Sequence, residues 1–206
     1  EEMKKAPPKA QAGQPAPADP SFEFKDAAFA LLTHNEGVLM QNDENKKRLR
    51  AALAEWSMTN FAERLEESSQ LYGVEQVLRE LGAEGVVRLP EQMVPGAKKL
   101  DRMADLVSEI GDTKTKEAAS QALVVVAKDI ASDHWIKQKE PLVDAANKAS
   151  KLNPTPEQFK AQLDQYQEGE LLRVFASMEK VGQGPAVDFL LDFAKTDKNE
   201  ERRAAA

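Results

Sequence analysis

The two histidines are the residues of this chain best suited to proton transfer or metal binding, and neither has a partner at a useful spacing. His34 lies just past an expected helix, and His134 directly follows Asp133. Neighbouring residues on a helix point in different directions, so Asp133 and His134 do not form a catalytic dyad. We expect His134 near the C-terminal end of a helix, where the helix dipole favours a positive charge.

Other groups that could carry chemistry are isolated or missing. Gly182-Gln183-Gly184 lacks the third glycine and the preceding strand of a phosphate-binding loop, so it indicates a turn between helices. Acidic pairs such as Glu66-Glu67 are typical of solvated helix faces, and nothing selects one as a glycosidase pair. The chain has no cysteine, which excludes thiol nucleophiles and cysteine-ligated zinc. We therefore expect no enzymatic activity and no cofactor, and we predict no catalytic, cofactor-binding or metal-binding residue.

The composition is typical of a soluble helical protein. Ala, Leu, Glu, Lys and Gln dominate the sequence, and all five are strong helix formers. The formal net charge of −7 argues against a dedicated nucleic-acid binder, because such proteins carry a basic surplus. There is no apolar run of about 18 residues, so the sequence predicts no transmembrane segment. We expect a soluble all-α protein whose partner is another protein.

Residues 1–20 differ from the rest of the chain. Half of them are proline or alanine, and they contain five of the eleven prolines. Without aromatic or β-branched side chains, they cannot bury enough apolar area to offset the entropy lost on ordering. The composition predicts a disordered or polyproline-like tether. The alternative is a docking arm that orders on a partner, with these candidate contacts: Pro7, Pro8, Pro15 and Pro17.

From residue 21 to residue 206 the pattern is that of one helical domain. In its first part the sequence predicts helices at 26–33, 44–67 and 73–81. Asp43 is the expected N-cap of the second of these helices. Pro90 and Pro95 interrupt residues 82–96, which we expect to be irregular.

The middle of the chain has the clearest helical periodicity. One helical face is formed by Leu100, Met103, Val107 and Ile110. Gly111 ends this helix and Asp112 starts the next one. The run from Val124 to Val126 could indicate a strand, but the period of 3.6 continues on both sides of it, so we predict a helix there.

The C-terminal part contains four more predicted helices: 142–152 with Pro141 near its start, 157–166, a helix from Leu171 to the turn at Gly182, and 187–194. Asn153 to Pro156 forms the turn between the first two. The last helix is apolar nearly all round, which predicts burial between neighbouring helices.

Two junctions between helices are alike. Each joins an apolar helix to a short turn with an aspartate, Asp112 or Asp197, and has an alanine seven residues later, Ala119 or Ala204. The aspartates are 85 residues apart, which equals about two repeats of 42 or 43 residues. Asn153 lies near the halfway point.

In these features the chain from residue 43 onward resembles the HEAT-repeat family, whose repeats of about 40–47 residues are helix pairs stacked into a solenoid. At the last junction, Asp197, Arg202 and Ala204 occupy the family's aspartate, arginine and small packing positions. Residues 68–96 depart from the pattern. The resemblance implies a short α-solenoid of stacked antiparallel helix pairs, and the alternative is an irregular helical bundle. Because the sequence stops within a promising helix, we expect it to be interrupted within a repeat.

The resemblance implies a non-catalytic protein-binding scaffold or a subunit of a larger assembly, since such repeats present extended surfaces. The alternative is a helical accessory domain of an enzyme, or a solenoid acting on nucleic acid. Trp56 and Trp135 are large anchors that suit core packing, but Trp135 lies in a polar stretch and is the better candidate for an exposed partner contact. A Pro/Ala tether would also suit a bacterial envelope protein anchored upstream of residue 1, which we favour over a cytoplasmic location.

Overall fold

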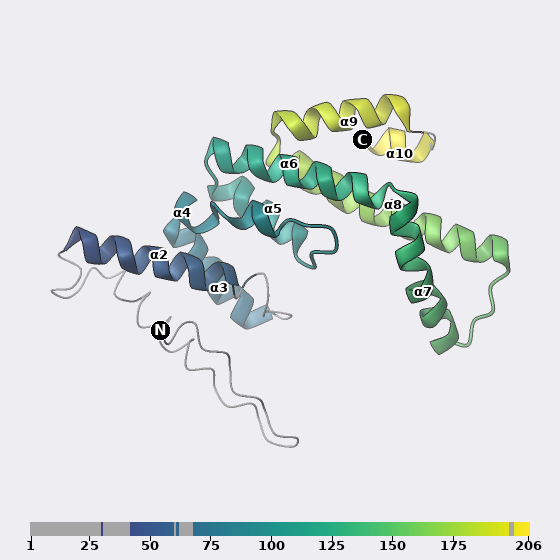
Figure 1. Cartoon of the computed structure of the whole chain (residues 1–206), viewed down its shortest axis with the longest axis horizontal. Coiled ribbons are helices and arrows are strands. Elements are labelled where there is room, and N and C mark those ends of the chain that lie inside the picture. Colours follow the sequence, from purple (N-terminus) through teal and green to yellow (C-terminus); the bar gives the residue numbers. More distant parts are fainter. Residues whose placement is uncertain (1–29, 31–41, 60, 62–67, 198–199) are drawn as a thin grey trace, which may run out of the picture. The chain divides into compact units, whose positions relative to one another are not determined.

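The computed structural model describes residues 30, 42–59, 61, 68–197 and 200–206. Every regular element in these ranges is helical (Figure 1), which confirms the all-α prediction. The chain divides into two compact units, Glu1–Arg88 and Leu89–Ala206. The four candidate prolines of the arm and His34 lie outside the described residues.

The first unit contains α2 (Asp43–Thr59), α3 (Ser68–Leu81) and the short α4 (Ala83–Val86). The prediction that Asp43 caps α2 is wrong. The cap is Asn42, whose Oδ1 atom accepts a hydrogen bond from the backbone N–H of Glu44 at 2.9 Å. The helix predicted over 44–67 is described only as far as Thr59, since residues 62–67 lie outside the described ranges.

Packing in the first unit joins α2 to α3. Leu53, Val77 and Leu81 form a buried apolar cluster. Arg50 of α2 donates from Nη2 to the backbone carbonyl of Leu81 at 2.8 Å and forms an ion pair with Glu84. A carbonyl at the end of α3, which has no partner within its own helix, is thereby satisfied. α4 and a 3₁₀ helix, η4 (Leu89–Gln92), lie in the stretch predicted to be irregular.

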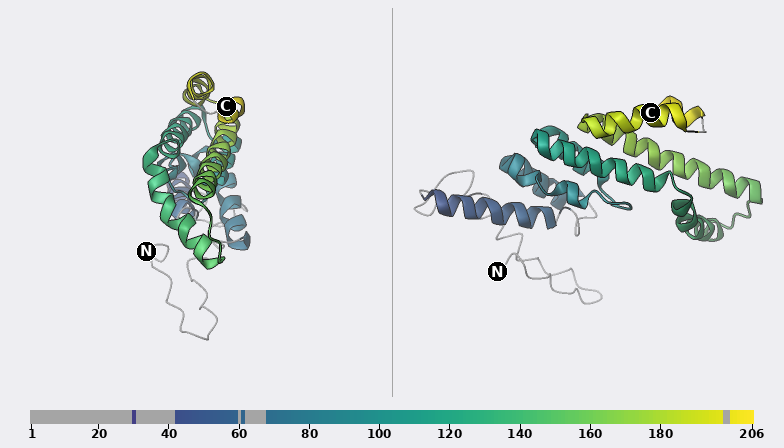
Figure 2. Two further views of the ribbon diagram at one scale, coloured as in Figure 1. Left: turned by 90° about the vertical axis from the view of Figure 1, so that its right-hand side faces the viewer. Right: turned by 45° about the horizontal axis from the view of Figure 1, so that its top comes forward.

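The second unit contains six α-helices after η4: α5 (Leu100–Ile110), α6 (Thr113–Ile130), α7 (Asp133–Ala149), α8 (Pro156–Val181), α9 (Gly184–Thr196) and α10 (Glu200–Ala205). α8 packs against both α5 and α6, and α9 packs against α6 and α8. Figures 1 and 2 show α6 and α8 side by side, with α7 turning away from them. Sequential helices are joined by short turns, but their stacking into a solenoid stays a prediction.

The α5–α6 junction follows the sequence prediction closely. The carboxylate of Asp112 accepts a hydrogen bond from the backbone N–H of Thr115 at 2.7 Å and so caps α6. Gly111 is required by space, because a Cβ atom there would come within 2.5 Å of the Val107 carbonyl oxygen. The valines at 124–126 are helical as expected, and Ala119 is fully buried.

α7 begins earlier than predicted. Ser132 caps it by accepting a hydrogen bond from the backbone N–H of Trp135, so His134 lies in the first turn and its predicted C-terminal position is wrong. Pro141 lies inside the helix rather than near its start. Proline cannot donate to the carbonyl four residues earlier, but Lys137 and Pro141 are both exposed, so water can satisfy that carbonyl.

α8 is one helix of 26 residues, where two separate helices were predicted. It begins with a capping box in which Thr155 and Gln158 bond each other's backbone N–H groups, as the predicted turn at Asn153–Pro156 allows. It continues through Gly169 and ends at Gly182, whose φ of 61° is left-handed.

The end of the chain is less buried than the sequence predicts. Val187 and Leu191 of α9 are 44% and 55% exposed, so the expectation that this helix is buried all round is wrong. Ala204 is exposed too, whereas the matching Ala119 of the first junction is buried. Among the described residues, no helix has the length and hydropathy that a membrane crossing requires.

Candidate functional site

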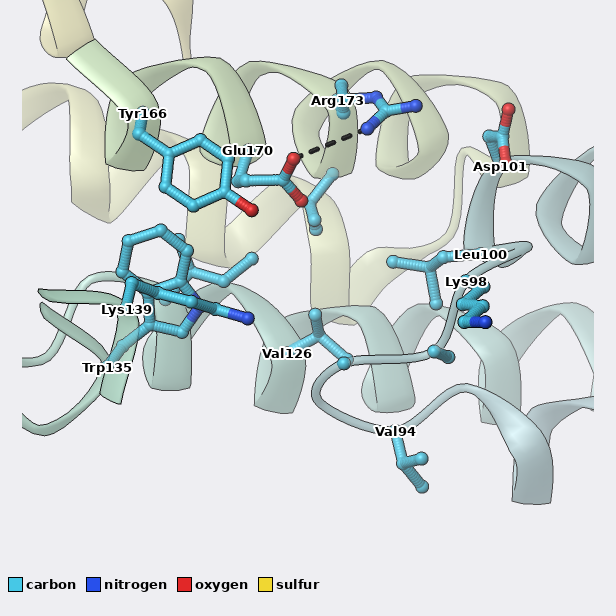
Figure 3. Close-up of a pocket in the computed structure, with 14 residues that line it drawn as sticks. Val94, Lys98, Leu100, Asp101, Val126, Trp135, Lys139, Tyr166, Glu170 and Arg173 are labelled. Carbon is cyan, nitrogen blue, oxygen red and sulfur yellow. Dashed lines mark hydrogen bonds and ion pairs between the residues drawn. The ribbon is translucent and has the colours of Figure 1, made fainter. Parts of the chain in front are cut away.

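A cleft with a volume of about 200 Å³ opens beside Trp135 in the second unit (Figure 3). The loop before α5, the start of α5, and parts of α6, α7 and α8 form its walls. We call it the Trp135 cleft, and it is lined by Val94, Gly96, Ala97, Lys98, Leu100, Asp101, Val126, Ile130, Trp135, Lys139, Tyr166, Glu170, Arg173 and Val174.

Three buried aliphatic side chains lie at the inner end of the Trp135 cleft. Val126 and Ile130 are one helical turn apart on α6, and Val174 comes from α8. All three are buried, and Leu100 at the start of α5 adds a partly buried side chain. These residues belong to the periodic apolar faces that hold α5, α6 and α8 together, so the packing of the unit also fixes this surface.

An aromatic pair forms one side of the cleft. The ring centroids of Trp135 and Tyr166 are 5.4 Å apart with an angle of 39° between the rings. Trp135 is only 5% exposed, so the expectation of an exposed tryptophan is wrong, although the residue does line the cleft. Tyr166 is 41% exposed and supplies the accessible ring.

Tyr166 was missed by the sequence reasoning. It lies in the mostly polar first half of α8, where Phe159 is the other aromatic residue. Its spacing to Glu170 and Arg173 is four and seven residues, which places the three on one face of a continuous helix. The prediction of a helix break between Tyr166 and Leu171 hid this relation.

Charged side chains surround the mouth of the cleft. Figure 3 shows the Lys139 side chain lying over Trp135, with Tyr166 and Glu170 above it. The Nζ atom of Lys139 is 5.5 Å from the centroid of the Trp135 ring, a cation–π distance. Glu170 is paired with Arg173 on the same helix, at 3.3 Å between Oε1 and Nη1.

Two polar groups at the mouth have no hydrogen-bond or ion-pair partner within the described residues. The Lys139 ammonium forms no ion pair there, and the Tyr166 hydroxyl makes no hydrogen bond. Asp101 interacts with another cation: Lys180 donates a hydrogen bond to Asp105, which raises the pKa of Lys180, and the charge of Asp101 raises it further. Lys139 is thus a partly buried cation whose counter-ion is not supplied by a neighbouring carboxylate of the described residues.

A second, more open groove lies between α7 and the start of α8, with a volume of about 620 Å³. Pro141, Leu152 and Phe159 give it an apolar lining. Its charged residues include Asp144 and Lys148, which are paired at 2.6 Å between Oδ2 and Nζ. The two hollows therefore lie along the same helix, one at each half of α7.

The other groups considered from the sequence are not brought together. His134 is exposed, and its Nε2 atom lies 2.8 Å from Nε2 of Gln138, one turn along α7. The Gly182–Gly184 segment forms the predicted turn between α8 and α9. Within the part of the chain that the structure describes, no three His, Cys, Asp or Glu side chains form a group that could hold a metal ion.

The chain matches no family model, no curated protein and no solved structure.

Proposed function

We propose that the chain is a non-catalytic protein-binding module, and that the Trp135 cleft receives a side chain of its partner. The observation that carries the proposal is the chemistry of the cleft. Buried Val126, Ile130 and Val174 form its floor, while the Lys139 ammonium and the Tyr166 hydroxyl have no hydrogen-bond or ion-pair partner within the described residues. A hollow that combines aliphatic side chains with charged and hydroxyl groups is typical of a recognition site.

The size of the cleft favours a protein partner over a small molecule. Pockets for small ligands usually have volumes of about 300–1,000 Å³, whereas this one has about 200 Å³. A volume of that size suits one apolar side chain, which would be an anchor of the kind that dominates protein interfaces. The formal charge of −7 argues against nucleic acid as the partner.

The scaffold role and the HEAT-like repeat are part of the same proposal. Helix pairs joined by tight turns, such as α5 with α6 and α8 with α9, support it, because stacked pairs leave their outer faces free for partners. Within this proposal, the surface that binds the partner is the Trp135 cleft, formed mainly by α5, α6, α7 and α8.

A selection from displayed short random peptides against the full chain tests the proposal, with the affinity of the recovered peptides measured by fluorescence anisotropy. We expect Tyr166→Ala to weaken their binding at least about fivefold, since an aromatic anchor truncated at an interface costs more than about 1 kcal/mol. The matched control is Leu172→Ala, because Leu172 is on the same helix, is 42% exposed and does not line the cleft. Failure to recover any peptide whose binding depends on Tyr166 but not on Leu172 would reject the cleft as the binding site.

A further inference from the structure

The charges that line the Trp135 cleft are unlike those of the whole chain. Three cationic side chains, Lys98, Lys139 and Arg173, face two acidic ones, Asp101 and Glu170. The cleft is therefore net positive on a chain whose formal charge is −7. A positive site attracts a negative group, whereas the net charge of the whole chain repels it.

Lys139 is the cation in the best position to receive that group. Arg173 is already paired with Glu170, and Asp101 acts on Lys180. The Lys139 ammonium rests against the Trp135 ring at 5.5 Å, without a carboxylate partner among the described residues. Its side chain is partly buried, so part of the desolvation that an ion pair requires has already occurred.

An apolar anchor and an anion must be close together in any ligand that uses the whole cleft. Figure 3 shows the Lys139 side chain extending toward Val126 of the floor, with the Tyr166 hydroxyl and Glu170 facing them from α8. A ligand whose apolar group lies on Val126 and Ile130 therefore places its neighbouring groups next to Lys139.

We infer that the Trp135 cleft recognises a short peptide segment in which an apolar side chain is adjacent to an aspartate or glutamate, the apolar group filling the hollow and the carboxylate pairing with Lys139. This inference rests on the proposed function and adds the chemistry of the partner. The Tyr166 hydroxyl donates a second hydrogen bond to the same carboxylate or to the peptide backbone.

The test compares the peptides selected by the full native chain with those selected by the full Lys139→Glu chain. All peptides are synthesised with amidated C-termini, so that a terminal carboxylate cannot replace the side chain. We expect peptides selected by the native chain to be enriched in Asp or Glu beside an aliphatic or aromatic residue. Replacing that acid by its amide should weaken binding about tenfold or more, as for a hydrogen bond to a charged group. Lys139→Glu should reverse the preference and enrich Lys or Arg at the same place.

Two controls separate an effect on binding from an effect on folding. Lys137→Glu makes the same charge change on the same helix at an exposed position outside the cleft, and we expect it to leave the selected motif unchanged. Lys139→Gln removes the charge without introducing repulsion, and on it the acid and amide peptides should bind equally. Thermal unfolding of each variant confirms that it is folded.

The outcomes distinguish this inference from the proposed function. Peptides that depend on Tyr166 but carry no acid, or that keep their acid preference with Lys139→Glu, would overturn the inference while the binding module stands. Peptides with a free C-terminal carboxylate that bind where amidated ones do not would overturn it as well, in favour of C-terminus recognition. Absence of any Tyr166-dependent peptide would reject both.

Discussion

α6 and α7 are neighbouring helices of almost equal length that differ sharply in how they are held. α6 has 18 residues, of which eight are buried. α7 has 17 residues, and only Trp135 and Asn147 are buried. Both begin with a residue whose side chain caps the first turn, Asp112 in α6 and Ser132 in α7. The two helices are thus capped in the same way, and the difference in their burial comes from their tertiary contacts.

The position of each helix in the unit explains this contrast. α6 lies among α5, α8, α9 and η4, whereas the main contacts of α7 within the described residues are with α8 and α6. A helix with few buried contacts opens more easily than the core around it. The Trp135 cleft lies between these two helices, with its inner end formed by α6 and α8 and one side formed by α7.

The largest expected effect comes from truncating the core of α6. Leu123 is fully buried, and we expect Leu123→Ala to lower the free energy of unfolding by about 2–5 kcal/mol, because it removes buried methyl groups and leaves a cavity. The same substitution at Leu142 of α7, which is 60% exposed, should change it by less than about 0.5 kcal/mol. Chemical denaturation measures both, and equal losses would contradict the contrast between the helices.

A smaller effect is expected from a serine that links α6 to the start of α9. The Ser120 hydroxyl is buried, accepts a hydrogen bond from the backbone N–H of Ala186 at 2.7 Å, and lies 3.3 Å from the carbonyl of Gln183. Gln183 itself provides no side-chain cap to α9, so Ser120 performs this role from another helix. Ser120→Ala removes the shorter of two hydrogen bonds made by the Ala186 N–H, which keeps its 3.1 Å bond to the Gln183 carbonyl, and should cost about 0.5–1.5 kcal/mol.

Ser177→Ala is the control for that experiment. Ser177 is equally inaccessible, but its hydroxyl bonds only to the carbonyl of Arg173 in the same helix, at 3.0 Å. That carbonyl keeps its helical partner after the substitution, so we expect a smaller loss in thermal unfolding. A larger loss for Ser177→Ala than for Ser120→Ala would disprove the tertiary cap.

On α7, the hydrogen bond between Asn147 Nδ2 and Gln162 Oε1, at 2.8 Å, fixes the end farther from Trp135. Because both groups can reach water when the helix opens, we expect Asn147→Ala to cost only about 0.5–1.5 kcal/mol. In native-state hydrogen exchange, the protection of the backbone amides of α7 should fall, while the protection of those in the middle of α6 should stay unchanged. An equal change in both helices would mean that α7 opens only with the whole unit.

The smallest expected effect is a pH dependence at the cap of α6. Hydrogen bonds from Thr115 lower the pKa of Asp112 below its usual value of 3.8. A lowered pKa in the folded state means that the ionised carboxylate stabilises the fold above pH 3.8, and that this contribution is lost as the pH falls through the folded pKa. Asp112→Asn keeps a capping side chain without the charge, so the native chain should be the more stable one near neutral pH. Denaturation in a pH series should show this advantage disappearing in acid, and a constant difference would contradict it.

Sequence reasoning succeeded where a feature depends on near neighbours. The cap at Asp112, the turn before α8 and the turn at Gly182 were all predicted, because the physics of caps and turns involves only a few consecutive residues. The same reasoning failed at Gly169 and Pro141. Each of these residues disfavours a helix locally. In α8, the packing of the helix against α5 and α6 outweighs the cost of Gly169, which is about 1 kcal/mol relative to alanine.

By itself, the sequence determined that the chain is all-α, where α5 and α6 begin and end, and that its acidic balance is unlike that of nucleic-acid binders. Only the tertiary structure decided that Trp135 is covered, that Tyr166 is the accessible ring beside it, and that Lys139 meets the apolar floor of α6. The physical reason is that caps and periodicity act within one or two helical turns. A cleft depends on which faces of separate helices pack together. Here this is decided by contacts distributed over α5, α6, α7 and α8.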